Sequence, residues 1–182
     1  PALSGSISII DYDGPLHNAK QAIDAGIGLV PEDRKLQGIT LEMSIRDNLS
    51  LASMRDHQKN GFLNFPYEIE NSAEQIKAMS IATPDDTKEV QLLSGGNQQK
   101  VVIGKWLATH PKLLLLDEPT RGIDVGAKGE IYTLIDKLAK QGVAILFVSS
   151  DMEEVLSLSD RVIVMHEGQI TGKLTKSELS EE

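Results

Sequence analysis

The second half of the chain alternates between apolar runs and stretches with helical periodicity. The runs at residues 113–116 and 143–148 contain only apolar residues, which is typical of strands buried on both faces. Between them, apolar residues recur at the i, i+3, i+4, i+7 spacing of one helix face: Ile131, Leu134, Ile135 and Leu138. Asp124 is placed to cap this helix and Gly142 to end it, and residues 97–108 form a helix before the first run. Buried strands separated by helices predict a parallel sheet of the α/β class.

The amino-terminal segment predicts three short elements. Residues 6–10 alternate polar residues with Ile and lead to Asp13-Gly14, so we expect a half-buried edge strand that enters a tight turn. Asn18 is a suitable cap for a short helix that follows the turn. The apolar residues 27–30 then form a buried strand that ends before a proline.

Two further elements follow the run at 143–148. Met152, Val155 and Leu156 lie on one face of a short helix. Apolar residues at 162–165 and 170–174 flank a turn sequence, which predicts a terminal hairpin.

The character of the chain changes between about residues 41 and 92. Apolar residues recur there near helical spacing, and turn sequences interrupt them. We therefore divide the single, partial domain 1–182 into an α/β core, residues 1–40 and 93–182, and an inserted helical subdomain at about 41–92.

Composition narrows the classes of function. The 182 residues are 40% hydrophobic and include no cysteine, which excludes a disulfide framework, a thiolate metal site and a cysteine nucleophile. The net charge of −9 opposes attraction to a phosphate backbone, so we expect no nucleic-acid partner. The first residues show neither an export signal nor an initiator Met, and we expect them to be internal to a longer protein.

Two adjacent acids follow the first apolar run. Asp117 and Glu118 stand at the carboxyl end of a predicted parallel strand, where open α/β sheets place their ligands. Asp117 has the chemistry to hold Mg²⁺, and Glu118 to orient and deprotonate a water that attacks a γ-phosphate. The alternative is that the two acids only end the strand and cap the next turn.

A second motif opens the helix that precedes this strand. Gly95 and Gly96 lack Cβ atoms, so their backbone N–H groups can approach phosphate oxygens, and Ser94 adds a hydroxyl. The helix N-terminus supplies partial positive charge. A Ser-Gly-Gly sequence is also common in flexible loops. We interpret this one as an anion site because it lies about twenty residues before the two acids.

Together these motifs resemble the ABC ATPases. Residues 93–100, Leu-Ser-Gly-Gly-Asn-Gln-Gln-Lys, resemble the signature loop, and residues 116–124 resemble the Walker B strand and D-loop. Residues 30–35, Val-Pro-Glu-Asp-Arg-Lys, and the variants within the other two motifs resemble the second ATPase half of tandem monosaccharide importers, above all the ribose type. The implied fold is that of a P-loop NTPase lacking its Walker A strand and helix.

The resemblance implies a composite site for ATP and Mg²⁺ between two ATPase halves. Ser94, Gly95 and Gly96 would contact the nucleotide of the opposite half, while Asp117 and Glu118 would serve the nucleotide of their own half. Further nucleotide contacts are implied for the remaining motif positions: Gln98, Asp124 and Glu32. Asp124 has the compatible alternative role of a helix cap.

The resemblance also implies a setting for the parent protein. It would couple ATP hydrolysis to import of a ribose-like monosaccharide at the cytoplasmic face of the inner membrane, as a peripheral subunit. Its partners would be a second ATPase half, membrane permease subunits and, indirectly, a periplasmic sugar-binding protein.

Three departures from the family pattern bear on hydrolysis. The sequence has no Gly-x-x-x-x-Gly-Lys-Ser/Thr phosphate loop, so we expect this fragment alone to be inactive. Glu32 stands where the family has a magnesium-contacting Gln, with an ion pair between Asp33 and Arg34 as the plain alternative. Ser150 stands where the family has the switch His, and a hydroxyl cannot replace an imidazole in handling a proton. This half is therefore expected to bind ATP better than it hydrolyses it.

Two alternatives stay open at this point. The chain could be a noncatalytic half that completes the site of its partner, or a soluble ABC-type ATPase with no role in transport. We assign the four histidines to the surface, because they lack the paired spacing of a metal site. We assign Trp106 to packing and not to base stacking, because it falls in the helix after the signature-like loop.

Overall fold

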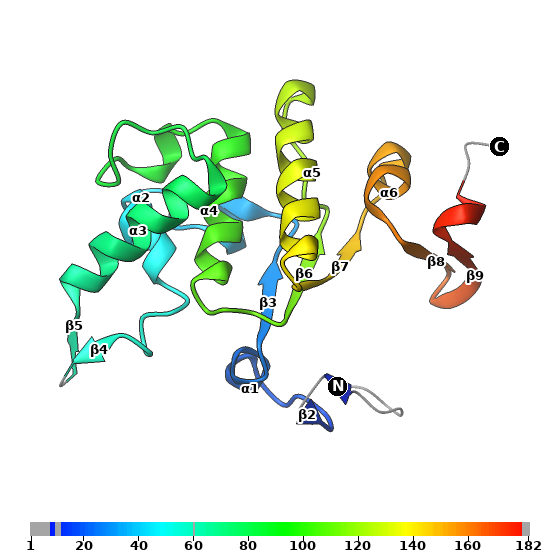
Figure 1. Ribbon diagram of the computed structural model, residues 1–182, viewed down its shortest axis with the longest axis horizontal. Helices are drawn as coiled ribbons and strands as arrows, with labels where there is room; N and C mark the ends of the chain where they lie inside the picture. Colours follow the sequence, from blue (N-terminus) through cyan, green and yellow to red (C-terminus); the bar gives the residue numbers. More distant parts are fainter. Residues whose placement is uncertain (1–7, 10–11, 60, 180–182) are drawn as a thin grey trace.

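The computed structural model describes residues 8–9, 12–59 and 61–179, and a three-stranded parallel sheet lies at its centre (Figure 1). The strands are β3 (Ile27–Val30), β6 (Leu113–Asp117) and β7 (Ala144–Val148), in the order β3-β6-β7. All three run in the same direction, with Leu29 opposite Leu115 and Leu115 opposite Leu146. The carboxyl ends of the strands therefore meet at one edge, as predicted.

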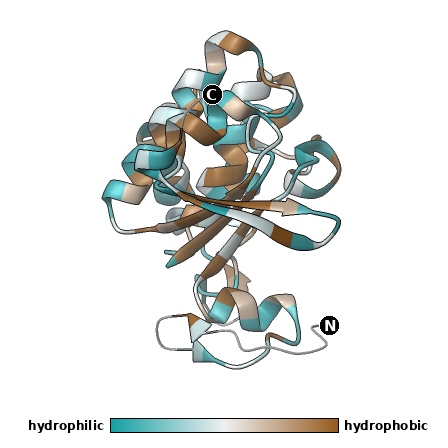
Figure 2. Ribbon diagram, turned by 90° about the vertical axis from the view of Figure 1, so that its right-hand side faces the viewer, coloured by the Kyte–Doolittle hydropathy of each residue, from teal (hydrophilic) through white to brown (hydrophobic). Residues whose placement is uncertain are grey.

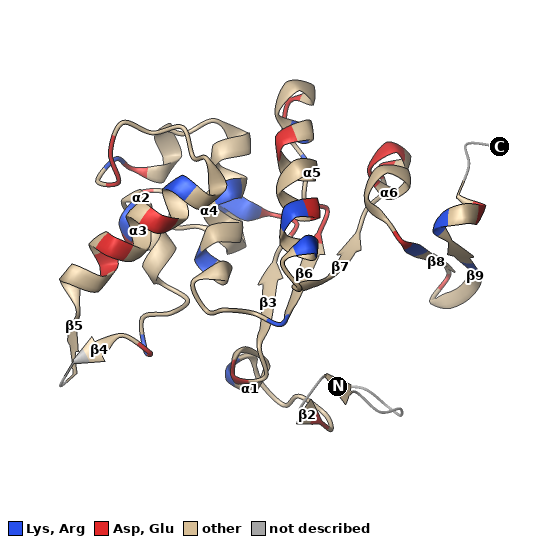
Figure 3. Cartoon of the chain, in the orientation of Figure 1, with Lys and Arg blue, Asp and Glu red and all other residues tan. Residues whose placement is uncertain are grey.

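Two long helices cover one face of this sheet. They are α4 (Gly95–Leu107) and α5 (Val125–Lys140), which stand side by side in Figure 1. The inward face of α5 consists of the four predicted apolar residues, all of them buried: Ile131, Leu134, Ile135 and Leu138. Basic residues occupy the last turn of α5, where their positive charge interacts favourably with the negative end of the helix dipole (Figure 3).

The opposite face of the sheet is open in the described part of the chain, which corrects the prediction of strands buried on both faces. Leu114 and Leu116 of β6 are buried under the helices. Leu115 points to the opposite face, and its neighbours across the sheet are Leu29 of β3 and Leu146 of β7. Leu115 is partly buried, whereas Leu29 and Leu146 are 48% and 57% exposed. Figure 2 shows the hydrophobic strands beneath the helical layer. A strand made only of apolar residues is buried on both faces only when other elements pack against both faces of the sheet. The sequence of the strand does not show whether such elements are present.

The amino-terminal elements differ from the prediction in one turn. Strand β1 (Ser8–Ile9) pairs antiparallel with β2 (Tyr12–Asp13), so Asp13 belongs to a strand and not to the predicted turn; residues 6, 7 and 10 of the predicted strand lie outside the described residues. Helix α1 (Ala19–Asp24) begins where predicted, because the Asn18 side chain accepts a hydrogen bond from the Gln21 N–H.

The segment between residues 41 and 92 contains two helices, α2 (Ile45–Ser50) and α3 (Phe65–Met79), that pack on α4. It also contains a hairpin that was not predicted, β4 (Gln58–Lys59) with β5 (Phe62–Leu63), and a 3-10 turn, η2 (Val90–Leu92). Apolar residues of both helices join the core under α4, so the limits of the inserted subdomain stay a prediction.

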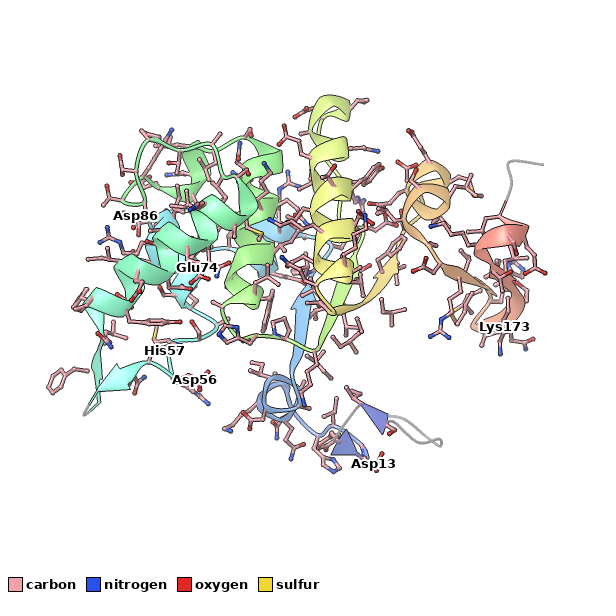
Figure 4. All side chains as sticks on the ribbon, in the orientation of Figure 1. Asp13, Asp56, His57, Glu74, Asp86 and Lys173 are labelled. Carbon is pink, nitrogen blue, oxygen red and sulfur yellow. The ribbon has the colours of Figure 1, made fainter. Side chains whose placement is uncertain are left out.

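A partly buried ion pair between Arg46 and Asp86 holds the loop that follows α3. Asp86 lies beside that helix (Figure 4), and Arg46 of α2 donates to it from Nε at 2.7 Å. The Ser72 hydroxyl of α3 also donates to the Asp86 carboxylate. These donors, Arg46 first, hold the pKa of Asp86 below its usual range. One carboxylate thereby joins α2, α3 and the loop.

The remaining elements agree with the prediction. Helix α6 (Met152–Leu158) follows β7, and β8 (Arg161–His166) pairs with β9 (Gln169–Thr175) before the short η3 (Lys176–Glu178). None of the helices described here has the length and apolar character needed to cross a bilayer.

Candidate functional site

Glu118 is fixed across the carboxyl ends of two strands. It follows β6 in the left-handed backbone region, with φ of +46°, and its N–H donates to the Val148 carbonyl at 2.9 Å. Its carboxylate accepts the Ser150 N–H at 2.9 Å. The conformation costs energy in a residue other than glycine and is typical of functional sites. The structure thus brings together Glu118 and Ser150, which the sequence placed 32 residues apart.

An open cleft surrounds this pair. It is lined by residues from two loops and from the start of α5: Glu118, Thr120, Arg121, Gly122, Ile123, Lys128, Ser150 and Asp151. Asp117 ends β6 beside the cleft, opposite Val148 in the sheet register. Glu118 therefore does not cap its own turn with its side chain, which reaches the loop after β7 instead.

Lys128 and Asp151 form an ion pair in this cleft that the sequence did not suggest. Lys128 Nζ donates to Asp151 Oδ2 at 2.6 Å. The pair raises the pKa of Lys128 and lowers the pKa of Asp151, in each case mainly through the hydrogen bond. It holds the start of α5 against the start of α6, and only a tertiary contact could have revealed it.

Glu154 is a buried carboxyl behind the same cleft. It is completely inaccessible to solvent, and neither carboxyl oxygen makes a hydrogen bond of ordinary geometry among the described residues. Burial raises the pKa of Glu154, and the nearby Ser149 and Thr120 hydroxyls oppose that rise only in part. Negative charge on Asp151 and Glu118 raises the pKa further. The folded state therefore favours the neutral acid.

We expect Glu154→Gln to stabilise the protein increasingly as the pH rises. A raised pKa in the folded state means that the contribution of Glu154 is fully present below the unfolded pKa and is lost as the pH rises through the folded value. Relative to the wild type, the variant should gain about 1 kcal/mol or more by pH 8 and little near pH 4.5. Urea unfolding across this range measures the difference. Glu153→Gln, at an exposed position on the same helix, is the control for the change from carboxyl to amide.

The signature-like loop begins α4 and is shaped by packing within the chain. Ser94 caps the helix by accepting the Asn97 N–H. A Cβ on Gly95 would lie 2.9 Å from Arg34 Nη2, and one on Gly96 would lie 2.9 Å from Ala127 Cβ. The two glycines therefore let α4 approach its neighbours, in addition to the access for phosphate that the sequence suggested.

Gln98 turns inward rather than toward the loop surface. It is 5% exposed, and its amide donates to the carbonyls of Val90 and Leu93 at 3.3 Å. The amide donors of Gln98 therefore support the loop from within, and a contact between Gln98 and nucleotide stays a prediction.

Two other predicted residues have local partners. Asp124 caps α5 by accepting the Ala127 N–H at 3.0 Å, which confirms its alternative role. Glu32 forms an ion pair with Arg121. Asp33 caps the short helix η1 (Arg34–Gly38) by accepting the Lys35 and Leu36 N–H groups, and the alternative ion pair with Arg34 does not form among the described residues. Instead, the Arg34 guanidinium donates to backbone carbonyls.

Trp106 packs against the hydrophobic core as predicted. It lies close to Gly28 of β3, where an added Cβ would be 3.1 Å from Trp106 Cβ. His57 stacks on Tyr67 with 3.5 Å between ring centres. The residues that the structure describes contain no group of three or more His, Cys, Asp or Glu arranged to hold a metal ion.

A parallel sheet with a capped helix and acids at its carboxyl edge defines a nucleotide-binding α/β class of protein. The family model of the ABC transporter matches residues 2–121. The chain belongs to the ABC transporter family, as an ATP-binding domain.

Curated relatives with high identity are sugar-import ATP-binding proteins. The arabinose import ATP-binding protein AraG of Pectobacterium atrosepticum is 52% identical over 162 residues, which cover 88% of this chain and 32% of AraG. The xylose import protein XylG of Photobacterium profundum is 48% identical, covering 98% and 35%. The ribose import protein RbsA of Rhodopirellula baltica is 46% identical, covering 100% and 35%. The chain spans about a third of the length of these relatives.

Solved structures confirm the predicted ABC ATPase fold. A dimeric post-hydrolysis state of an ATP-binding cassette bound to ADP and Pi matches with a TM-score of 0.78 at 21% identity, covering 96% of this chain and 74% of that one. The cbiO1 protein from Clostridium perfringens matches with a TM-score of 0.72 at 27% identity, covering 89% and 62%.

Proposed function

We propose that this chain is part of the ATP-binding subunit of an importer for a pentose sugar, most closely a ribose-like one. The support is its identity of 46–52% with proteins named for ribose, xylose and arabinose import. In this proposal the parent protein acts at the cytoplasmic face of the membrane with permease subunits, a second ATPase half and, indirectly, a sugar-binding protein.

The observation that carries a role in ATP use is the fixed position of Glu118. Its Oε1 accepts the Ser150 N–H, and no described residue forms a hydrogen bond to Oε2. A carboxylate held by one oxygen keeps the other free to orient a water and accept its proton, which is the task of a general base in phosphoryl transfer. Ser150 holds this carboxylate through its backbone, so its side chain need not be an imidazole for that contact.

Asp117 fits a magnesium ion that comes with ATP. A single carboxylate at the edge of the sheet suits Mg²⁺, which keeps several waters and takes other ligands from phosphates. When bound, Mg²⁺ neutralises charge on the phosphate oxygens. The residues of the chain would position the reactants: Asp117 would hold the ion, and Glu118 would orient the attacking water.

The loop at 94–96 would serve the nucleotide of the opposite half. Its capped helix N-terminus offers backbone N–H groups and partial positive charge, and Ser94 is exposed. Asp124 and Glu32, held by Ala127 and Arg121, would lie at the edges of the composite site and shape it. This arrangement needs a second half to act.

A noncatalytic half is the second candidate function, and Ser150 favours it. A hydroxyl at this place supplies no group that titrates near neutral pH. In that case residues 94–96 would complete the site of the partner while Glu118 contributes little to turnover. A soluble ABC-type ATPase without a transport role is the remaining alternative.

Sugar uptake by cells with and without the parent gene tests the transport function. We expect its deletion to abolish high-affinity uptake of labelled ribose, xylose or arabinose, and the intact gene to restore it. Uptake of an unrelated amino acid is the control. Unchanged uptake of all three pentoses would contradict the proposed import function.

A further inference from the structure

Arg34 connects three segments that lie far apart in the sequence. It begins η1, just after β3, and its side chain uses three different nitrogens. Nη1 donates to the Arg121 carbonyl at 2.8 Å and Nη2 to the Gly122 carbonyl at 3.1 Å. Nε donates to Gln98 Oε1 at 3.4 Å. One planar side chain therefore joins the loop after β3, the first turn of α4 and the turn before α5.

The surrounding backbone is built to receive this guanidinium. Gly122 has φ of +65°, a conformation that side chains disfavour. A Cβ on Gly95 would lie 2.9 Å from Arg34 Nη2 and 3.3 Å from the Gly122 carbonyl. Glycine at these two positions lets the guanidinium and the turn approach the start of α4.

The bonds of Arg34 continue in both directions. Gln98, which accepts from Arg34, also donates to the carbonyls of Val90 and Leu93, two residues that precede Ser94. On the other side, the Arg121 N–H donates to the Glu118 carbonyl at 3.0 Å. Side-chain and backbone bonds thus run from the loop at 94–96 to the residue proposed as general base.

We propose that Arg34 is a positioning residue that fixes the loop at 94–96 and the turn at 121–122 as one unit. This inference rests on the proposed function, in which the loop faces the nucleotide of the opposite half and the turn adjoins Glu118. A planar guanidinium presents a fork of donors to the paired carbonyls of Arg121 and Gly122, whereas the ammonium of a lysine acts as a point charge. The geometry of the fork, and not the charge, is the property required.

The test compares Arg34→Lys with the wild type and with Lys35→Gln, in the full-length protein within its importer. Lys35 is exposed and lies next to Arg34 in η1, and its substitution removes one positive charge. Arg34→Lys should lower kcat for ATP hydrolysis about tenfold or more, since small displacements near reacting groups have effects of this size. The Kd for ATP should change less than about threefold, and Lys35→Gln should match the wild type.

Hydrogen exchange on the nucleotide-free protein provides a readout independent of turnover. Arg34→Lys should speed exchange at both 95–98 and 121–123, and Lys35→Gln at neither. Unchanged exchange at either segment, or a loss of kcat that only follows the fraction of unfolded protein, would overturn the inference. A wild type that neither binds nor hydrolyses ATP would instead refute the proposed function, while the exchange result would still decide the role of Arg34.

Discussion

Glu118→Gln is expected to lower steady-state ATP hydrolysis by the whole importer about 100-fold or more, because an amide cannot accept the proton of the attacking water. The substitution keeps the shape of the side chain and an oxygen that can accept the Ser150 N–H. Binding of ATP should therefore persist. A phosphate-release assay measures the rate, and a fluorescent ATP analogue measures binding.

The control for this experiment is Glu153→Gln, an exposed acid on α6 near the same cleft. It changes the net charge equally and should leave the rate unchanged. If Glu118→Gln hydrolyses ATP at the rate of the wild type, this half is noncatalytic and the second candidate function is correct. The result thus decides whether Glu118 acts as a general base although Ser150 replaces the family's histidine, or whether this half does not hydrolyse ATP.

Local signals predicted most of the elements. Asn18 and Asp124 each cap a helix as predicted, and capping depends on residues three positions apart. The inward face of α5 followed from periodicity for the same reason. Each of these interactions closes within one turn of chain, so the sequence contains all of its parts.

The arrangement of the candidate site was only partly predictable. The position of Glu118 at the end of a strand could be inferred from the apolar run, but its bond to the Ser150 N–H depends on the pairing of β6 with β7. Gln98 was assigned to the nucleotide because it lies in the motif, yet tertiary packing turned its side chain inward. The roles of Arg34 and Glu154 arise from contacts that no spacing in the sequence records.

Gly96→Ala should destabilise the protein by about 2 kcal/mol relative to a tolerated glycine-to-alanine change, because the new methyl group overlaps a neighbouring helix. The added Cβ would lie 2.9 Å from Ala127 Cβ, and neither atom belongs to a flexible side chain. Helix α4 must therefore shift away from α5 and carry Ser94 with it. We expect ATP hydrolysis to fall at least about tenfold. Thermal unfolding and the phosphate-release assay measure the two effects.

Two further variants separate this overlap from the general effect of adding a methyl group. Gly129 also lies in α5, and a Cβ there meets nothing within 4 Å, so Gly129→Ala should stabilise the helix by up to about 1 kcal/mol. Ala127→Gly removes the other methyl group of the overlap, so the double variant with Gly96→Ala should recover most of the lost stability and activity. A coupling energy of about 1 kcal/mol or more between the two sites is expected. Additive effects would mean that Gly96 is required for its access to phosphate alone, whereas coupling would show that the glycine also sets the distance between α4 and α5.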